Sequence, residues 1–257
     1  MKIVIVNKSD RTGGAAVVSF RLMEALRGIG IDARMLVVEK LTDSRYVESA
    51  GSRLSINKKF IEERLKIFIA NGLNRATLFK IDTAADGLPL WNHPLVKDAD
   101  AVILNWVNQG MLSLKGVRKI LESGKPVVWT MHDMWCMTGI CHHAAECSEY
   151  RKNCGKCELL GPGALDKKLA AKIWKRKKTL YSLHEKIKFV AVSNWLYGKS
   201  KESGLLAGMD VSVIPNAFLF TEKGQGRIKK PCGDKITMGF GAARLDDPIK
   251  GLPVLVE

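Results

Sequence analysis

The segment from Met131 to Cys157 holds the densest set of side chains that could do chemistry. It contains five of the six cysteines and three of the five histidines in the chain. Cys141, Cys147, Cys154 and Cys157 are spaced C-x5-C, C-x6-C and C-x2-C. The two-residue gap lets both thiolates meet one ion, and four thiolates would form a closed, structural zinc site. Disulfides or free thiols are the alternatives. Substitute ligands in the same segment would be Cys136, His142 and His143.

His132 and Asp133 follow the apolar run Pro126–Met131, which predicts a buried strand. Ligands of parallel sheets bind at the carboxyl ends of the strands, so a histidine beside an acid is well placed there. Imidazole can form a hydrogen bond with a ligand or stabilise charge. Both residues are therefore candidate catalytic residues. The alternatives are that His132 is structural and that Asp133 only orients the loop.

Gly13 and Gly14 follow the first predicted strand, Ile3–Val6, and precede a helix with apolar residues at helical spacing. Without β-carbons, such a loop lets a phosphate or sugar approach the N–H groups at a helix N-terminus. The alternative is a tight turn between strand and helix, because the spacing G-x-G-x-x-G of dinucleotide-binding loops is absent.

Strands and helices alternate along most of the chain. Further strands are predicted at Ala33–Val38, Ala101–Leu104, Phe189–Val192 and Val211–Ile214. Helices are predicted at Leu112–Leu121, from about Asp166 to His184, and around Phe60–Ile69, whereas residues 82–97 are expected to be loop. This alternation predicts an α/β fold, a Rossmann-like parallel sheet with helices on both faces.

In such a sheet the loops at the carboxyl ends of the strands converge on one crevice. The loops expected there are Asn7–Gly14, Asn105–Gly110, His132–Thr138 and Ser193–Trp195. Residues 1–220 are predicted to form this domain, with a Cys-rich insertion at 136–160 and a linker at 221–234. A new strand at Ile236–Phe240 is expected to start a second domain, so that residues 235–257 are its truncated beginning.

The net charge of +15 favours anionic partners, which include nucleic acid, phosphorylated small molecules and anionic membranes. Lys167–Lys188 contains nine Lys or Arg and one acid. It is either a solvated helix face or a basic surface for lipid headgroups or a diphosphate-linked acceptor. Residues 53–80, in which apolar and basic residues mix, could form a second contact.

The apolar run at the N-terminus is shorter than the ~7–15 residues of an export signal. No run in the sequence approaches the ~18 apolar residues of a membrane span. We therefore expect a cytoplasmic protein, with peripheral contact to the inner face of the plasma membrane. Persistent disulfides are uncommon in that compartment, which favours zinc for the cysteines.

Taken together, these residues resemble glycosyltransferase family 4, of the GT-B fold. They are most similar to a bacterial branch with the pattern W-T-x-H-D-M-W-x-x-T-G-x-C-H after a strand, followed by three spaced cysteines. That pattern is carried by Trp129, Thr130, His132, Asp133, Met134, Trp135, Thr138, Gly139, Cys141, His142, Cys147, Cys154 and Cys157. Shorter matches are Gly13–Ala16, Asn105–Asn108, Val192–Leu196, Val213–Asn216, Gly241–Arg244 and Lys250–Gly251.

The resemblance implies a retaining enzyme that moves a sugar from a nucleotide-diphosphate sugar to a polysaccharide or lipid-linked acceptor. It implies that His132 faces the donor sugar, and that Arg244 and Lys250 hold the diphosphate without a catalytic metal. The other substrate-binding candidates are Gly13, Gly14, Asn105, Trp106, Ser193 and Asn216. Most donor contacts of the family lie in the second domain, so this chain is expected to be inactive alone.

Two other functions compete with this interpretation. A zinc-stabilised nucleic-acid-binding module would use the charge and the cysteines, but a base-stacking aromatic platform is not evident, and no nucleic acid is expected as a partner. A dinucleotide-dependent oxidoreductase would use Glu39 as the acid after the second strand, but the glycine spacing does not fit.

Overall fold

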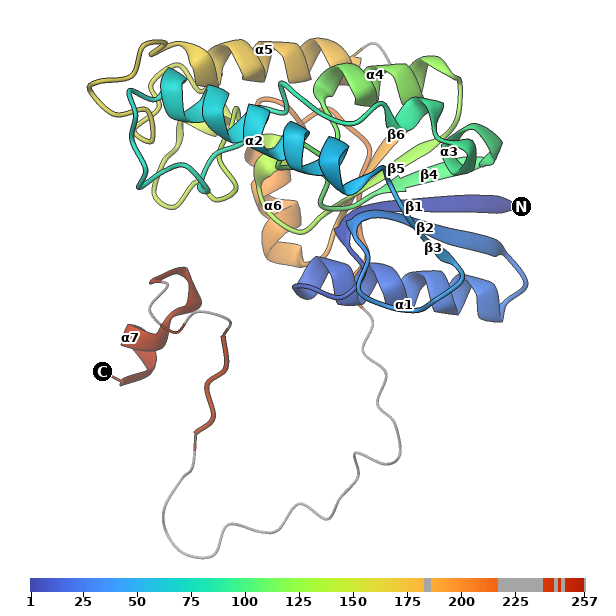
Figure 1. Cartoon of the computed structure of the whole chain (residues 1–257). Coiled ribbons are helices and arrows are strands. Elements are labelled where there is room, and N and C mark those ends of the chain that lie inside the picture. The colour runs from blue at the N-terminus through green and yellow to red at the C-terminus, as the bar shows by residue number, and fades with distance from the viewer. Residues whose placement is uncertain (183–185, 217–237, 243–244, 246–247, 257) are drawn as a thin grey trace, which may run out of the picture. The chain divides into compact units, whose positions relative to one another are not determined.

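The computed structural model describes residues 1–182, 186–216, 238–242, 245 and 248–256. The chain divides into two units, Met1–Ala217 and Phe218–Glu257. The first unit is an α/β domain built on one sheet (Figure 1). The second unit, in its described part, contains a 3-10 helix at Pro248–Lys250 and the short helix α7 at Leu252–Val256.

The sheet has seven strands in the order β3-β2-β1-β4-β5-β6-β7, and every neighbouring pair is parallel. The strands are β1 Lys2–Ser9, β2 Asp32–Glu39, β3 Val47–Ser49, β4 Ala101–Leu104, β5 Val127–Met131, β6 Ile187–Ala191 and β7 Val211–Val213. The helices of this unit are α1 Gly14–Gly28, α2 Arg53–Ala70, α3 Pro94–Asp98, α4 Leu114–Glu122, α5 Leu169–Ser182 and α6 Asn194–Glu202. The predicted Rossmann-like fold is therefore confirmed.

Alternate residues of β1 face two separate cores, because successive side chains of a strand point to opposite faces of a sheet. Ile3 and Ile5 pack in a smaller core with Met23 of α1. Val4 and Val6 pack in the larger core on the other face. Helix α1 thus covers one face, while α3, α4 and α5 lie on the other (Figure 1).

The local structure differs from the prediction at three places. Residues 82–97 were expected to be loop, but they contain a 3-10 helix at Leu90–Asn92 and helix α3, which His93 caps through a bond from the Leu95 amide. The helix predicted around Phe60–Ile69 is present, and it is longer than predicted, because it extends over Arg53–Ala70. The strand expected at Ile236–Phe240 lies partly outside the described residues, and Met238–Phe240 have no strand.

Helix α2 is attached to the domain by buried charged side chains. Arg64 donates through Nη2 to Oδ2 of Asp82 at 2.5 Å and through Nη1 to the carbonyl of Leu78 at 2.6 Å. Asp82 is fully buried and also accepts from the amides of Ala84 and Gln109. Because Gln109 follows β4, this ion pair links α2 to the carboxyl edge of the sheet.

Replacing Arg64 with Met should therefore lower the free energy of unfolding by about 3 kcal/mol, since it leaves the Asp82 carboxylate buried without its cation. Urea unfolding followed by circular dichroism measures the change. The matched control is Arg118→Met, which breaks an exposed ion pair with Glu122 and should leave stability essentially unchanged. Equal stability of the two variants would contradict the structural role of the buried pair.

Candidate functional site

The strand order changes direction between β1 and β4, and the rule for parallel sheets predicts a ligand crevice at that switch point. Side chains at the carboxyl ends of these two strands tie them together. The Asn7 carboxamide oxygen accepts from the Trp106 amide at 3.0 Å, and the Lys8 amide donates to the Trp106 carbonyl at 2.9 Å. Trp106 is thereby fixed at the mouth of the crevice.

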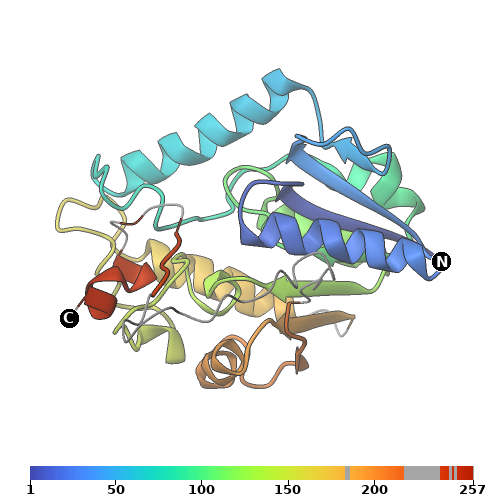
Figure 2. The same ribbon diagram turned by 90° about the horizontal axis from the view of Figure 1, so that it is seen from below.

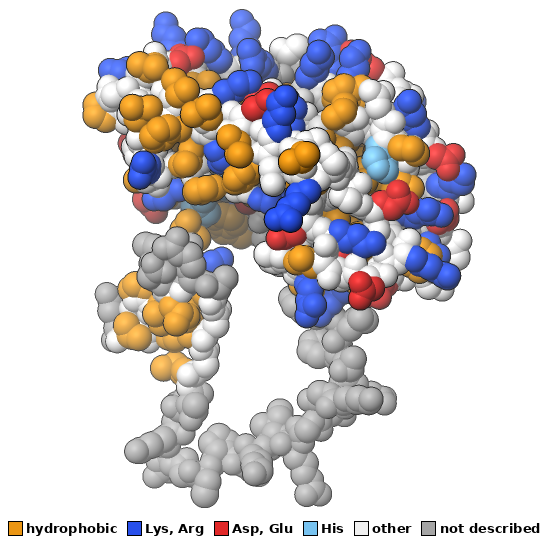
Figure 3. All heavy atoms as spheres, in the orientation of Figure 1, with side chains coloured by type: hydrophobic (Ala, Val, Ile, Leu, Met, Phe, Trp, Pro, Cys, Tyr) orange, Lys and Arg blue, Asp and Glu red, His pale blue; other side chains and the backbone are white. Residues whose placement is uncertain are grey.

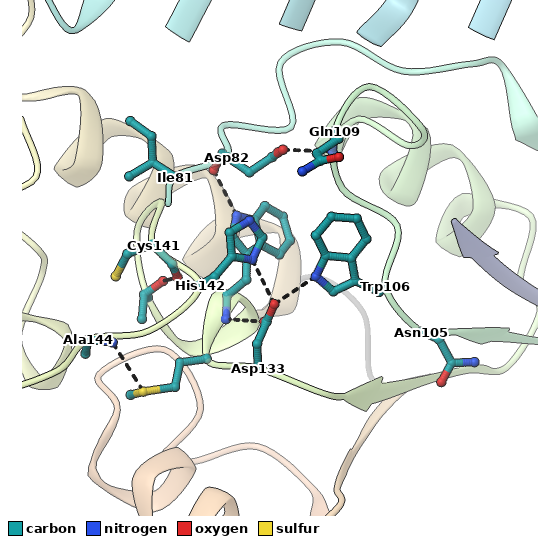
Figure 4. Close-up of polar contacts among 12 residues, drawn as sticks. Ile81, Asp82, Asn105, Trp106, Gln109, Asp133, Cys141, His142 and Ala144 are labelled. Carbon is teal, nitrogen blue, oxygen red and sulfur yellow. Dashed lines mark hydrogen bonds and ion pairs between the residues drawn. The ribbon is translucent and has the colours of Figure 1, made fainter. Parts of the chain in front are cut away.

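Asp133, which follows β5, is the centre of a hydrogen-bond network at this edge (Figure 4). Its Oδ2 accepts from the indole N–H of Trp106 at 2.9 Å and lies 2.7 Å from Nδ1 of His142. Its Oδ1 accepts from the Trp135 amide at 2.8 Å. Asp133 therefore connects the ends of β4 and β5 to the Cys-rich insertion, through His142.

These contacts determine the ionisation of Asp133. Burial acts to raise the pKa of this carboxyl, but the hydrogen bond and charge of His142, together with the donors on Trp135 and Trp106, outweigh it. The pKa of Asp133 consequently lies below the ordinary value of 3.8. The residue is a carboxylate at neutral pH. Its contact with Nδ1 holds the ring of His142, whose centroid lies 5.5 Å from the centroid of the Trp106 ring.

His132 is paired with Asn105, the first residue after β4. Its Nε2 lies 2.9 Å from Oδ1 of Asn105. Because an amide oxygen can only accept, Nε2 carries the proton and Nδ1 is left with its lone pair. Burial lowers the pKa of His132, although the charge of Asp133 acts in the opposite direction. His132 is therefore a neutral imidazole held in one tautomer.

Several polar atoms around this network are buried without a hydrogen-bond partner in the described part of the chain. They are Nδ2 of Asn105, Nδ2 of Asn108 and Nε2 of His142. Buried polar groups in folded proteins nearly always have partners, either in the protein or in bound water and ligands. Three such atoms at the carboxyl edge of the sheet make this edge the candidate functional site.

Gly13 and Gly14 form the junction between β1 and α1. Gly13 has φ 88, in the left-handed region that favours glycine, and no atom lies within 4 Å of where a β-carbon would be at either residue. Gly13 is the N-cap residue of α1, and no side chain of the described residues accepts a hydrogen bond from the amides at this end of the helix. The first turn of α1 has no acidic residue. The open N-terminus of α1 can therefore approach an anionic group through its amides.

The remaining predicted site residues lie in different places. Ser193 caps α6 by accepting from the Leu196 amide at 3.2 Å, and Asn216 is half-buried in the loop after β7. Lys250 ends the 3-10 helix of the second unit. Arg244 lies outside the described residues. The linker predicted at 221–234 lies outside them as well.

The Cys-rich insertion folds against the crevice. Cys141 forms an antiparallel bridge with Ile81, and the Met134 amide donates to the His142 carbonyl at 2.9 Å. Cys136, Cys141, Cys147, Cys154 and Cys157 are free. In the part of the chain that the structure describes, no three His, Cys, Asp or Glu side chains form a group that could hold a metal ion.

A pocket of ≈ 850 Å³ lies beside the crevice, between α2 and the ends of β1 and β2. Its lining includes Lys8, Arg53, Phe60 and Gln109. The Lys8 ammonium lies over the ring of Trp106, 5.3 Å from its centroid, and 5.5 Å from that of Phe60. Burial lowers the pKa of Lys8. The pocket thus combines aromatic surface with cations, and the contact of Lys8 with Trp106 connects its wall to the Asp133 network.

Sequence reasoning missed part of this site. The sequence marks His142 as a substitute metal ligand and as part of the resemblance pattern, but it does not predict the contact with Asp133, nine residues earlier in the chain. Asn7 and Lys8 were recognised only as members of a polar loop. Their contacts with Trp106 join segments about 100 residues apart, and no local pattern indicates such pairing. The one sequence feature that points to this network is the position of Asp133 directly after a predicted strand.

Comparison with known proteins yields no assignment, since neither a protein-family model nor a curated protein matches the chain.

Asp133→Asn should lower the free energy of unfolding by about 2 kcal/mol at neutral pH, because hydrogen bonds to a charged acceptor are lost. The folded-state pKa of Asp133 is depressed, so its stabilisation is present above the ordinary pKa of 3.8 and is lost as the pH falls through the folded value. Urea titrations of wild type and variant at neutral and acidic pH should therefore converge in acid. Asp43→Asn, at an exposed position after β2, is the control. A constant difference at every pH would contradict the ionised network.

Proposed function

We propose that this chain is the acceptor-side domain of a retaining glycosyltransferase that uses a nucleotide-diphosphate sugar. The observation that carries the proposal is the pairing of neutral His132 with Asn105 beside the Asp133 network, at the switch point of a Rossmann-like sheet. A site made of hydrogen-bonding side chains suits the recognition of sugar hydroxyls better than a metal centre or a nucleophile paired with a base would.

In the proposed reaction, the bond between the anomeric carbon of the donor sugar and the diphosphate oxygen breaks. The acceptor hydroxyl oxygen attacks the same face of that carbon, and its proton passes to the leaving diphosphate. His132 contributes by accepting a hydrogen bond at Nδ1 from a hydroxyl of the donor sugar. A group fixed beforehand in a water-poor site stabilises a transition state without reorganisation, and the contact with Asn105 supplies that fixation.

The acceptor in this proposal is a polysaccharide or a lipid-linked glycan that enters through the pocket beside α2. Lys8 and Arg53 offer cations to a diphosphate link, and Phe60 offers an aromatic face to a sugar ring. The open N-terminus of α1 at Gly13 and Gly14 is available to anionic groups of either substrate. The donor diphosphate is assigned to Lys250 and Arg244 by resemblance alone.

The proposal includes a structural zinc ion in the Cys-rich insertion. Sγ of Cys154 accepts from the Gly139 amide at 3.2 Å, and Cys157 accepts from the amides of Leu159 and Leu160. Burial raises the pKa of both thiols, that of Cys154 to about 12, and these amide donors act in the opposite direction. Zinc binds the thiolate, so it would displace the proton of each cysteine ligand. The donor set fits the metal chemically, but the thiol side chains must turn toward a common point to ligate it.

About one zinc per chain should be found by elemental analysis of protein purified without chelators. Cys154→Ala should lose that zinc and melt at a lower temperature, because metal binding contributes to folding. Cys232→Ser, outside the described residues and outside the proposed ligand set, should keep both properties. Metal-free protein with two disulfides among Cys141, Cys147, Cys154 and Cys157 would exclude zinc.

His132→Ala tests the proposed function in the gene product as the cell makes it. Turnover should fall about 100-fold, equivalent to ~3 kcal/mol, with a smaller effect on KM, because the lost contact acts mainly in the transition state. The melting temperature should change little, since the side chain lies at a strand end. His93→Asn, which keeps a capping residue at the start of α3, is the control and should turn over normally. Normal turnover by a folded His132→Ala enzyme would remove His132 from the mechanism.

A further inference from the structure

Helix α2 has an inverted distribution of side chains. Its inward face carries two charged residues, Glu63 and Arg64, which are buried together with Ile67. Glu63 accepts from the Thr83 amide at 3.0 Å, from the Thr83 hydroxyl at 2.6 Å and from the Asp86 amide at 3.0 Å. Hydrogen bonds and the ion pair of Arg64 therefore hold this helix to the domain, where apolar packing would be usual.

The outward face of α2 is apolar. Leu54, Ile61, Leu65 and Ile69 are exposed by 83%, 60%, 52% and 46%, and together they are called the α2 ridge. At 3.6 residues per turn they fall within about 80° of arc, on the side opposite Glu63. Leu73 and Phe79 continue the exposed apolar surface past the end of the helix. Scattered exposed apolar residues are normal, but an aligned series on one face indicates a binding surface.

In Figures 1 and 2, no other segment of the described part of Met1–Ala217 covers this outward face. Figure 3 shows hydrophobic side chains gathered over the C-terminal half of α2, with Lys and Arg side chains around them. Lys58 stands on the ridge face itself, 73% exposed and 4.0 Å from a carboxylate oxygen of Glu62. Lys66 stands beside the ridge, 58% exposed and paired with Asp86. Arg75 and Lys80, in the segment after α2, are also exposed.

We propose that the α2 ridge is a membrane-docking face that seats the chain on a bilayer containing anionic lipids. An apolar stripe bordered by cations on one face of a helix is the composition of helices that lie in the membrane interface. The 18 residues of α2 extend about 27 Å, which provides a long strip of contact in the plane of the bilayer. Within the described residues, no helix is long and apolar enough to cross a membrane.

The charge of the chain favours an anionic bilayer as the partner of the α2 ridge, over another protein or a second copy of this chain. With a net charge of +15, two copies repel each other, whereas anionic headgroups attract each of them. The ridge side chains supply apolar area to the headgroup boundary, and the bordering lysines contact the phosphates. The proposal is independent of glycosyl transfer, since binding to lipid needs neither donor nor acceptor.

Cosedimentation of the full chain with extruded vesicles tests the proposal. The chain should bind vesicles of phosphatidylglycerol and phosphatidylcholine, bind pure phosphatidylcholine much less, and release as salt is raised. The double variant Ile61→Ser with Leu65→Ser should reduce partitioning on the order of 100-fold, because two partly inserted aliphatic side chains are lost. Both positions are exposed, so the variant should keep the wild-type circular dichroism and melting temperature.

The matched control is the double variant Val17→Ser with Ile29→Ser, which removes two exposed aliphatic side chains from the region of α1. It should bind vesicles within about twofold of wild type if the ridge is the docking face. Equal loss of binding in both double variants would overturn the proposal, as would unchanged binding of the ridge variant. A dimer seen by light scattering that Leu65→Ser dissociates would show a second copy as the occupant and would also overturn it.

Discussion

One half-buried carboxylate, that of Asp133, organises the carboxyl edge of the sheet. It receives donors from three directions: the Trp106 indole after β4, the Trp135 amide in its own loop and the His142 ring in the Cys-rich insertion. A charge withdrawn from water is stable only when hydrogen bonds and an opposite charge replace its hydration. Asp133 therefore keeps its hydrogen bonds only when β4, β5 and the Cys-rich insertion lie in their observed positions relative to one another.

The geometry of His132 follows from that constraint. With the loop after β5 fixed through Asp133, His132 projects toward Asn105, and the pair holds one tautomer of the imidazole. The amide Nδ2 of Asn105 is left buried without a partner in the described residues, as is Nε2 of His142. The side chains that stabilise the network thus also carry the unpartnered polar atoms on which the proposed ligand binding depends.

Much of the sheet could be predicted from the sequence, because β1, β2, β4, β5 and β6 contain residues that are fully or nearly buried and appear as short apolar runs. The edge strand β3 was not predicted, since only Val47 of its three residues is buried. The full length of α2 was not predicted either. Its inward face carries Glu63 and Arg64 and its outward face carries aliphatic residues, which is the reverse of the pattern that helix prediction relies on.

The candidate site was predictable to the same limited degree. The rule that ligands bind at strand ends correctly brings Asn105, Trp106, His132 and Asp133 to one edge, because it depends only on strand order. The place of His142 depends on how an irregular loop returns to the sheet, and the tie between Arg64 and Asp82 depends on a buried ion pair between distant segments. Neither leaves a periodic signal in the sequence.

The stereochemistry of sugar transfer tests the central claim most directly. The gene product, as the cell makes it, would be supplied with a panel of nucleotide-diphosphate sugars and extracted polysaccharide or lipid-linked acceptors. The anomeric configuration of the product would be determined by NMR. The account predicts a product with the same configuration as the donor, together with release of the nucleoside diphosphate. An inverted product, or no transfer from any donor by correctly folded protein, would contradict it.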